Sequence, residues 1–252
     1  MFRRLFYWYA PIGAALIACA VFGAGFYSFV TGDTGEAVAS APRETRVAAP
    51  RAEVAPLVIG DSLARGTGDE TGLGIGGRLV DELKKTHVSV KPQINIAVNG
   101  YRTKDVEEQL KSRNVQTLIA QSNVIVVSIG GNDLWGSTNP REVMLRNPMT
   151  VMSQVLDHVD KIVRTVRTLN PNARIFLIGL YNPFTSAPFG KQLSGLVNQW
   201  NARVTERFAG DANFTLVETS DLFSHRDRLS LDRFHPNSEA YGMIARRIAE
   251  SL

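Results

Sequence analysis

Short apolar runs alternate with amphipathic segments along most of this 252-residue chain, and this alternation limits the fold more than any other feature. The apolar runs are rich in Val and Ile and predict strands at residues 57–60, 93–98, 124–129, 174–179 and 215–218. The segments between and after them predict helices at residues 76–85, 105–112, 115–121, 151–169, 191–208 and 237–252. Such an order predicts an α/β fold: a three-layer α/β/α sandwich around a five-stranded parallel sheet.

The N-terminal region differs from the rest of the chain in composition. Arg3 and Arg4 precede an uncharged stretch whose core, from Leu5 to Val30, is almost wholly apolar. A membrane-spanning helix needs about 20 apolar residues, whereas the apolar part of a cleavable signal peptide has about 7–15. We therefore expect a transmembrane signal anchor over residues 1–30, with its N-terminus inside and the remaining chain outside the cytoplasm, because the positive charges precede it.

Two other interpretations of this region stay open. Residues 37–39 (AVA) or 39–41 (ASA) have the form of a signal-peptidase site, and cleavage there would release the rest of the chain in secreted form. Residues 16–19 (LIAC) have the form of a lipobox, in which Cys19 would be lipidated, although the apolar run continues beyond it. Cys19 is the only cysteine, so the exported part has neither a disulfide nor a thiol nucleophile.

Composition separates the remaining chain into a linker and one domain. Residues 31–54 are rich in Ala, Pro, Gly, Arg and Glu and have no apolar period, which predicts a flexible linker. Residues 55–252 have a length typical of a single domain. The net charge of +4 is dispersed, so it does not indicate a nucleic-acid partner. No cluster of acids, His and Cys has metal-ligand spacing, and we expect neither a metal nor another cofactor.

Polar and glycine-rich residues follow the predicted strands at their carboxyl ends. They are Asp61 and Ser62 after the first strand, Asn99 and Gly100 after the second, Gly130 to Asp133 after the third, and Asp232 and His235 after the fifth. Ligands of a doubly wound sheet bind beyond the carboxyl ends of its strands, so we expect these residues to gather at one site.

Four blocks carry a resemblance to a known family: Gly60-Asp-Ser62-Leu63, Asn95 to Gly100, Gly130-Gly-Asn132-Asp133 and Asp232-Arg-Phe-His235-Pro236. Together and in this order they resemble the SGNH/GDSL hydrolase superfamily of esterases and lipases, over nearly all of residues 56–252. The resemblance implies a flavodoxin-like sheet, with Ser62 as nucleophile, His235 as base and Asp232 as its orienting partner. It also implies an oxyanion hole made by the Ser62 N–H, the Gly100 N–H and the Asn132 side-chain amide.

The chemistry of these residue types agrees with the resemblance. A serine hydroxyl is a poor nucleophile at neutral pH, so it needs a base, and the base needs a partner that fixes its tautomer. His235 is the only one of four histidines with a carboxylate three residues before it. His87 and His158 are expected on helix surfaces, and His225 in a charged loop.

A competing motif is weaker. Gly72-Leu-Gly74-Ile-Gly-Gly77 satisfies the GxGxxG pattern of dinucleotide-binding proteins. However, it starts well after the first strand, and no acidic residue closes the second. We interpret it as a loop that leads into a helix.

The expected function is therefore a membrane-anchored, extracytoplasmic serine esterase or lipase that hydrolyses carboxylic esters of lipids or of acylated glycans. Two alternatives stay open: acyl transfer to, or deacetylation of, envelope glycans, and a non-catalytic binding module with a relict site. Five aromatic residues are expected near the site, namely Tyr101, Trp135, Tyr181, Phe184 and Phe189. They suit an apolar acyl group and equally suit packing of the loops themselves.

Overall fold

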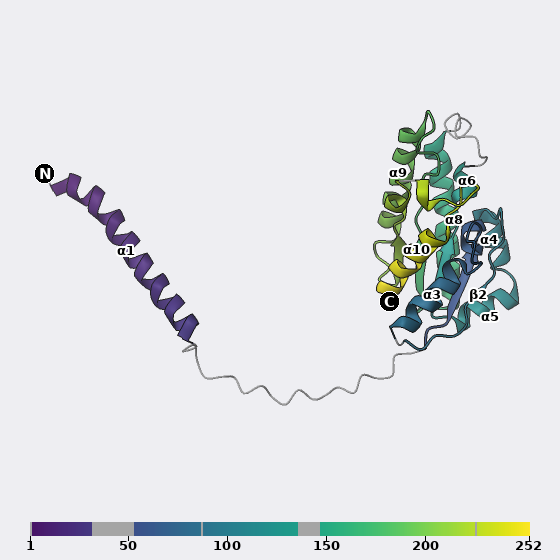
Figure 1. Ribbon diagram of the computed structural model, residues 1–252, viewed down its shortest axis with the longest axis horizontal. Coiled ribbons are helices and arrows are strands. Elements are labelled where there is room, and N and C mark those ends of the chain that lie inside the picture. The colour runs from purple at the N-terminus through teal and green to yellow at the C-terminus, as the bar shows by residue number, and fades with distance from the viewer. Residues whose placement is uncertain (1, 32–52, 87, 136–146, 225) are drawn as a thin grey trace. The chain divides into compact units, whose positions relative to one another are not determined.

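The computed structural model describes residues 2–31, 53–86, 88–135, 147–224 and 226–252, without the side chains of residues 2–12 and 14. The chain divides into two units, Met1–Ala49 and Pro50–Leu252 (Figure 1). The first unit contains helix α1 (Phe2–Thr31). Within the part of the chain described here, no helix is both long and apolar enough to cross a membrane. Helix α1 covers the predicted anchor, but the side chains of residues 2–12 and 14 are not described, and most of the predicted linker lies outside the described residues. The anchor and the linker therefore stay predictions.

The second unit contains the predicted five-stranded parallel sheet. Its strands are β1 (Pro56–Gly60), β2 (Ile94–Asn95), β3 (Val124–Ser128), β4 (Arg174–Ile178) and β5 (Phe214–Val217). They lie in the order β2-β1-β3-β4-β5, and each pairs with its neighbours in parallel. This is the strand order of flavodoxin-like sheets, in which ligands bind where β1 and β3 diverge.

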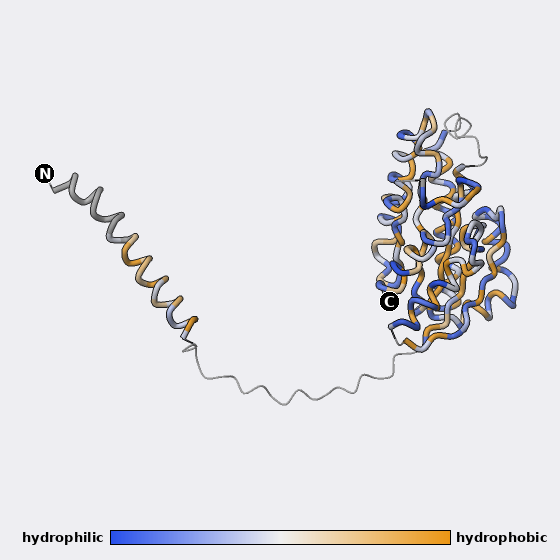
Figure 2. The backbone as a smooth tube through the Cα atoms, in the orientation of Figure 1, coloured by the Kyte–Doolittle hydropathy of each residue, from blue (hydrophilic) through white to orange (hydrophobic). Residues whose placement is uncertain are grey.

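Helices cover both faces of this sheet, as predicted, with small shifts at their ends. One face carries α3 (Gly74–Lys85) and α10 (Ser238–Glu250). The other carries α4 (Thr103–Gln109), α5 (Arg113–Gln121), α8 (Pro148–Leu169) and α9 (Gly190–Phe208). Short turns of helix follow the strands at α2 (Ser62–Arg65), α6 (Gly131–Trp135), η1 (Ser220–Phe223) and η2 (Arg226–Arg228). Hydrophobic and hydrophilic residues alternate along the long helices (Figure 2).

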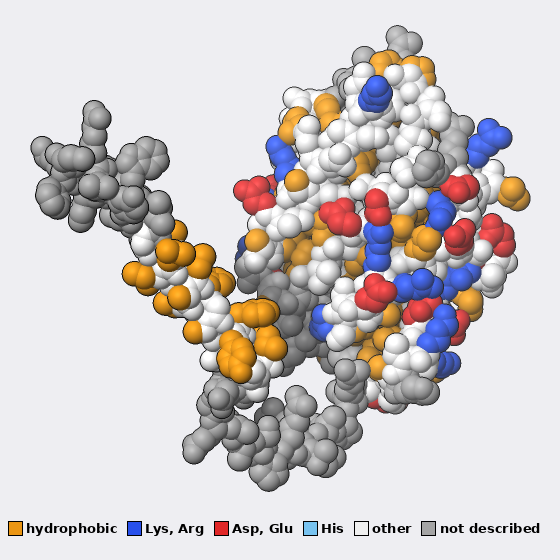
Figure 3. All heavy atoms as spheres, turned by 60° about the vertical axis from the view of Figure 1, so that its left-hand side comes forward, with side chains coloured by type: hydrophobic (Ala, Val, Ile, Leu, Met, Phe, Trp, Pro, Cys, Tyr) orange, Lys and Arg blue, Asp and Glu red, His pale blue; other side chains and the backbone are white. Residues whose placement is uncertain are grey.

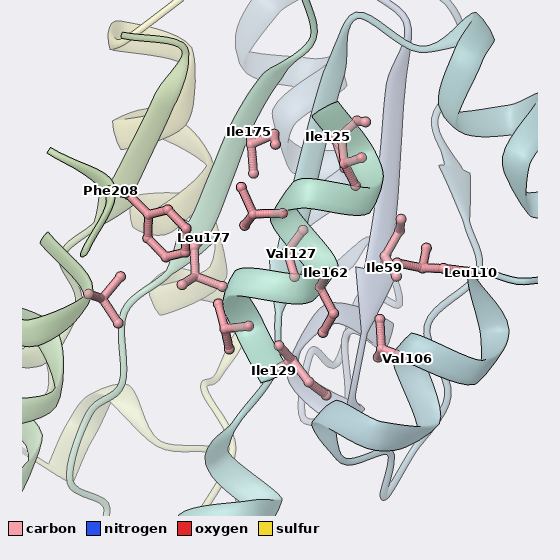
Figure 4. Packing of buried hydrophobic residues seen from close by; sticks show 14 of the residues in the cluster. Ile59, Val106, Leu110, Ile125, Val127, Ile129, Ile162, Ile175, Leu177 and Phe208 are labelled. Carbon is pink, nitrogen blue, oxygen red and sulfur yellow. The ribbon is translucent and has the colours of Figure 1, made fainter. Parts of the chain in front are cut away.

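The central strands are apolar on both sides because both of their faces are covered. Ile125 and Val127 of β3 point into the layer that contains Ile162 of α8 (Figure 4). Val124 and Val126 point into the opposite layer, under α3 and α10. Side chains alternate along a strand, so a continuous apolar run is what a doubly covered strand requires.

The predicted strand at residues 93–98 is shorter than expected, because only Ile94–Asn95 has regular strand pairing. The Asn95 side chain forms hydrogen bonds with backbone groups on both sides of the strand end. Its amide donates to the Ala64 carbonyl at 2.9 Å, and its Oδ1 accepts from the Ala97 N–H at 3.0 Å. The backbone nevertheless stays beside β1, since the N–H of Val98 donates to the Gly60 carbonyl at 2.9 Å. The edge strand therefore ends early but still leads to the predicted site.

Charged side chains of opposite sign are intermixed on the face of the second unit that Figure 3 shows. Among the described residues, charged side chains of opposite sign also form ion pairs, such as that between Arg207 and Asp157 at 3.2 Å. The dispersed charge of the sequence is thus also dispersed in space on this face.

Candidate active site

Ser62 lies at the carboxyl end of β1, at the turn where the chain enters α2. Gly60 precedes this turn with φ of +137°, and a Cβ there would lie 1.8 Å from the Ser128 carbonyl oxygen, so only glycine fits. Asp61 caps α2, because its side chain accepts from the Leu63 N–H at 3.0 Å. Ser62 is then the first helical residue, and its N–H has no acceptor within the helix.

Three polar side chains form a continuous series of hydrogen bonds across this end of the sheet. His235 Nε2 lies 2.8 Å from Ser62 Oγ, although the two residues are far apart in the sequence. His235 Nδ1 lies 2.6 Å from Asp232 Oδ2. The structure therefore brings together the three residues that the sequence selects as nucleophile, base and orienting partner.

The environment of Asp232 fixes the direction of these hydrogen bonds. Its Oδ1 accepts from Ser230 Oγ at 2.7 Å, from the Phe234 N–H at 2.8 Å and from the His235 N–H at 2.9 Å. Desolvation acts to raise the pKa of Asp232, but these donors and the His235 ring outweigh it and hold the pKa well below its usual range. An ionised carboxylate only accepts, so Nδ1 must donate, and Nε2 of the neutral ring faces the Ser62 hydroxyl as an acceptor.

The loop that carries Asp232 and His235 is tied down at several points. Leu229 and Pro236 form an antiparallel bridge, and the Ser230 N–H donates to the His235 carbonyl at 2.8 Å. The hydroxyl of Tyr181, from the segment after β4, donates to the Phe234 carbonyl at 2.7 Å. These contacts hold His235 from both ends of the loop.

Sequence reasoning missed the role of Asp61 as a buried carboxylate. It is only 6% exposed, and its Oδ1 also accepts from Ser128 Oγ at 3.1 Å. Desolvation raises the pKa of Asp61 to about 7, and the hydrogen bonds from Ser128 and the Leu63 N–H offset this only in part. Ser128, a lone polar residue at the end of an apolar strand, was the one signal that could have revealed this pair.

Asn132 lines the same cavity as Ser62 and His235. Its Nδ2 donates to the Tyr101 carbonyl at 2.9 Å, and the second N–H of this amide makes no hydrogen bond to any described residue. The next residue, Asp133, accepts from the Thr103 N–H at 3.0 Å and from Thr103 Oγ1 at 2.7 Å. The loop after β3 is thereby fixed to the start of α4.

Gly100 lies in an exposed turn after β2, and it is not among the described residues that line the cavity. Its neighbour Asn99 is linked to the nucleophile turn through Thr67, whose Oγ1 donates to Asn99 Oδ1 at 3.1 Å. The Thr67 N–H in turn donates to the Ser62 carbonyl at 3.0 Å. The role of Gly100 in an oxyanion hole therefore stays a prediction.

The cavity beside Ser62 has a volume of about 40 Å³ and one apolar side. Trp135 and Leu180 form part of its wall, and both residues also line a neighbouring cavity whose described lining is wholly apolar and includes Met152 and Trp200. Of the five predicted aromatics, Trp135 and Tyr181 lie on the wall of the site cavity.

The other three predicted aromatics pack behind the wall or elsewhere. Phe184 makes an edge contact with Trp135, with ring centroids 6.4 Å apart. Phe189 packs against the same cluster. Tyr101 packs instead against the core beneath α4 and α8. Most of the loop at residues 135–149 lies outside the described residues.

The other histidines take no part in this site as far as the structure describes them. His158 lies on helix α8, as predicted, but its side chain is only partly exposed, and its Nδ1 is hydrogen-bonded to Glu107 of α4. His87 and His225 lie outside the described residues. Among the residues with described positions, no three His, Cys, Asp or Glu side chains are grouped to hold a metal ion.

Comparison with known proteins identifies the family. The profile of the GDSL-like lipase/acylhydrolase family matches residues 58–243. The chain belongs to this family. GDSL-family proteins are generally carboxylic ester hydrolases, so membership of the family implies an ester substrate.

Individual relatives of this GDSL protein agree in sequence or in fold. The uncharacterized protein YpmR of Bacillus subtilis (strain 168) is 31% identical over 202 residues, which are 77% of this chain and 79% of that protein. The lipase Lip_vut3 from a goat rumen metagenome has a TM-score of 0.66 at 20% identity, over 79% of this chain and 97% of that one. A family 3 carbohydrate esterase of Clostridium thermocellum has a TM-score of 0.54 at 19% identity, over 79% and 94%. The two structures show a common fold.

Proposed function

We propose that this chain is a serine esterase that hydrolyses carboxylic esters, with Ser62 as nucleophile, His235 as general base and Asp232 as the residue that orients it. The observation that carries the proposal is the series of hydrogen bonds from Asp232 through His235 to Ser62, at the wall of a cavity. The same arrangement of an acid, an imidazole and a hydroxyl performs acyl transfer on several unrelated folds.

In the first half of the reaction, the Ser62 hydroxyl attacks the ester carbonyl carbon while its proton moves to Nε2 of His235. The ionised Asp232 stabilises the imidazolium that forms, without taking the proton itself. The carbon–oxygen bond to the alcohol then breaks, and the imidazolium donates its proton to the departing alkoxide. An acyl-Ser62 ester remains.

In the second half, a water molecule gives a proton to His235 and attacks the acyl-Ser62 carbonyl, and the carboxylic acid is released as Ser62 recovers its proton. Both halves place negative charge on the former carbonyl oxygen. We assign the Ser62 N–H, the Gly100 N–H and the Asn132 amide as its donors. The support is strongest for Ser62, whose N–H has no helical acceptor, and for Asn132, which has an N–H to spare.

The acyl group is proposed to lie against the apolar side of the cavity. Trp135 and Leu180 join the site to a hollow with only apolar described lining, and such a surface offers a charged or strongly hydrated group no partner. The substrate is therefore an ester whose acid part is a hydrocarbon chain or an acetyl group, derived from a lipid or from an acylated glycan.

The N-terminal segment is proposed to anchor this catalytic unit outside the cytoplasm. The support is the order of Arg3, Arg4 and the apolar run from Leu5 to Val30 in the sequence. Protease treatment of intact cells that carry the full chain would degrade the catalytic unit, and fractionation would keep it with the membrane. Recovery of a shortened chain from the medium would favour cleavage after residue 39 or 41 instead.

The central test uses the full-length chain and its Ser62→Ala variant. The unmodified chain is expected to hydrolyse p-nitrophenyl acetate and to react with a fluorophosphonate probe, whereas Ser62→Ala should do neither while keeping its circular dichroism spectrum. Full activity of the variant would exclude Ser62 as nucleophile. An intact chain that never reacts with the probe would point to a non-catalytic module. A glycan acceptor added to the assay separates hydrolysis, which releases free acid, from transfer, which yields acylated glycan.

A further inference from the structure

Four consecutive residues, 67–70, connect the nucleophile turn to the C-terminal segment that carries His235. The Thr67 carbonyl accepts from the Tyr241 hydroxyl of α10 at 2.7 Å, while its N–H donates to the Ser62 carbonyl at 3.0 Å. The Glu70 carboxylate accepts from the Ser238 N–H, at the start of α10, at 3.1 Å. The segment is thus joined to the Ser62 turn at one end and to α10 at both.

Gly68 lies between Thr67 and Glu70, the two residues that contact α10, and its backbone packs directly against the loop that carries His235. It has φ of +92°, and a Cβ added to it would lie 2.6 Å from the Pro236 carbonyl oxygen, 2.9 Å from the His235 Cβ and 2.9 Å from Ser230 Oγ. A real Cβ essentially never lies within 3.0 Å of another heavy atom in this way, so the His235 loop can pack against residue 68 only because glycine has no side chain. No other described glycine comes this close to the His235 side chain.

Asp69 makes the segment rigid. Its side chain is fully buried and ion-paired with Arg78, whose Nε lies 3.0 Å from Oδ2 and whose Nη2 lies 3.0 Å from Oδ1. The same carboxylate accepts from the N–H and hydroxyl of Thr71 at 3.0 and 2.8 Å, and from the Gly74 N–H at 2.8 Å. A carboxylate with five donors is difficult to displace.

On the other side of the contact, residues 231–233 of the His235 loop are more exposed than Asp69. Arg233, one residue after Asp232, has φ of +58°, an unfavourable value for a residue with a side chain. The Asp232 side chain is 44% exposed, and Leu231 is 98% exposed. A clash at Gly68 would therefore displace the loop of His235 rather than the segment braced by Asp69.

We infer that residues 67–70 are a positioning segment that sets the separation between Ser62 and His235, and that Gly68 is the residue on which this separation depends. The inference rests on the proposed function, because the rate of hydrolysis depends on the distance between Ser62 and His235 only if these two side chains react as proposed. One residue of the glycine-rich stretch that resembles a dinucleotide motif, Gly74, contributes to this segment, because its N–H donates to Asp69 Oδ2 at 2.8 Å.

The test compares Gly68→Ala with Gly72→Ala in the full chain. Gly72 also has a positive φ, +72°, but nothing lies within 4 Å of a Cβ placed there, so this variant carries the backbone strain without the clash. For Gly68→Ala, we expect kcat on p-nitrophenyl acetate and the rate of fluorophosphonate labelling to fall by about 10²-fold, the effect of roughly an ångström of misplacement. KM should stay within about twofold, since Trp135 and Leu180, which form the apolar side of the cavity, belong to other segments of the chain.

Gly72→Ala is expected to lower Tm while both rates stay within about threefold of the unmodified chain. Equal losses of activity in the two variants, or full activity in Gly68→Ala, would overturn the inference while the proposed function stood. An unmodified chain that does not label would overturn both.

If Gly68→Ala does not fold, Tyr241→Phe decides the question, because it removes only the hydroxyl that holds the Thr67 carbonyl. A kcat reduced about three- to tenfold at unchanged KM is expected from one lost hydrogen bond. An unchanged kcat would contradict a positioning role for this segment.

Discussion

Two aspartates flank the proposed reaction centre, and their environments are opposite. Asp61 precedes the nucleophile in the chain, is 6% exposed, and has a pKa raised by desolvation to about 7. Asp232 lies beside the base with a side chain that is 44% exposed, and it has a pKa well below the usual range because its donors outweigh its desolvation. The same type of side chain is therefore a weaker acid than usual at Asp61 and a stronger acid than usual at Asp232.

The difference shows that the two halves of the site are held by different forces. Asp61 is buried at the edge of the sheet. It accepts one hydrogen bond from the Leu63 N–H, which caps α2, and one from Ser128 Oγ. Donated hydrogen bonds hold Asp232, whose other carboxylate oxygen lies within hydrogen-bond distance of His235 Nδ1. Carboxylates whose pKa values are driven apart in this way take different roles, and we assign reaction to Asp232 and structure to Asp61.

Replacement of Asp232 by Asn should give the largest change. An amide at this position can donate to Nδ1 of His235, which would leave Nε2 protonated and unable to accept the Ser62 proton. We expect kcat to fall by about 10⁴-fold, as for the equivalent change in other triads. Steady-state kinetics at pH 8 measure it, and a loss of less than tenfold would show that Asp232 does not set the tautomer.

Replacement of Asn132 by Ala tests a donor that is independent of both carboxylates. The loss of one oxyanion donor typically lowers kcat by about 10²–10³-fold. KM for p-nitrophenyl acetate should change little, because the charge that Asn132 stabilises appears only in the transition state. Asn132→Asp serves as the matched comparison, and it should be at least as impaired since it adds a negative charge. A rise in KM alone would assign Asn132 to substrate binding.

Replacement of Asp61 by Asn should affect stability more than catalysis, because the amide oxygen can still accept from Leu63 and Ser128. We expect kcat within about tenfold of the unmodified chain. The pKa of Asp61 is raised in the folded state, so the stability linked to its proton is fully present below the ordinary value of 3.8 and is lost as pH rises through about 7.

At roughly 1.4 kcal/mol per pKa unit, this loss is on the order of a few kcal/mol, and Asp61→Asn should abolish it. Urea unfolding between pH 4 and pH 8 would then give a flatter profile for the variant. Parallel profiles of the two chains would show that the Asp61 carboxyl is ionised throughout.

The smallest effects come from the serines that donate to each carboxylate, and together they form a matched pair. Ser128→Ala removes a donor to Asp61, and Ser230→Ala removes one to Asp232, at about 1 kcal/mol each at pH 8. At pH 5, Asp61 is protonated and the cost of Ser128→Ala should shrink, while Asp232 stays ionised and the cost of Ser230→Ala should persist. Equal pH dependence of the two variants would remove the distinction between the aspartates.

The sequence alone determined the sheet and the identity of the three side chains that we propose to react. Continuous apolar runs such as residues 124–128 predict doubly covered strands, and the topology of a parallel sheet places the residues after each strand at one edge. Ser62, Asp232 and His235 could be selected because they follow predicted strands and belong to the blocks that carry the family resemblance. The family resemblance rested on the same short blocks, and the family comparison confirmed it.

Only the tertiary structure decided what surrounds those side chains. The burial of Asp61 depends on Ser128 from another strand, and the support of His235 depends on Gly68 and Tyr181 from two further segments. Likewise, the pairing of His158 with Glu107 depends on how α8 packs against α4. Desolvation and steric contact arise between residues distant in sequence, and no local pattern encodes them. The sequence therefore predicts which residues form the proposed site. The pKa values of its aspartates and the distance between Ser62 and His235 depend on the tertiary structure.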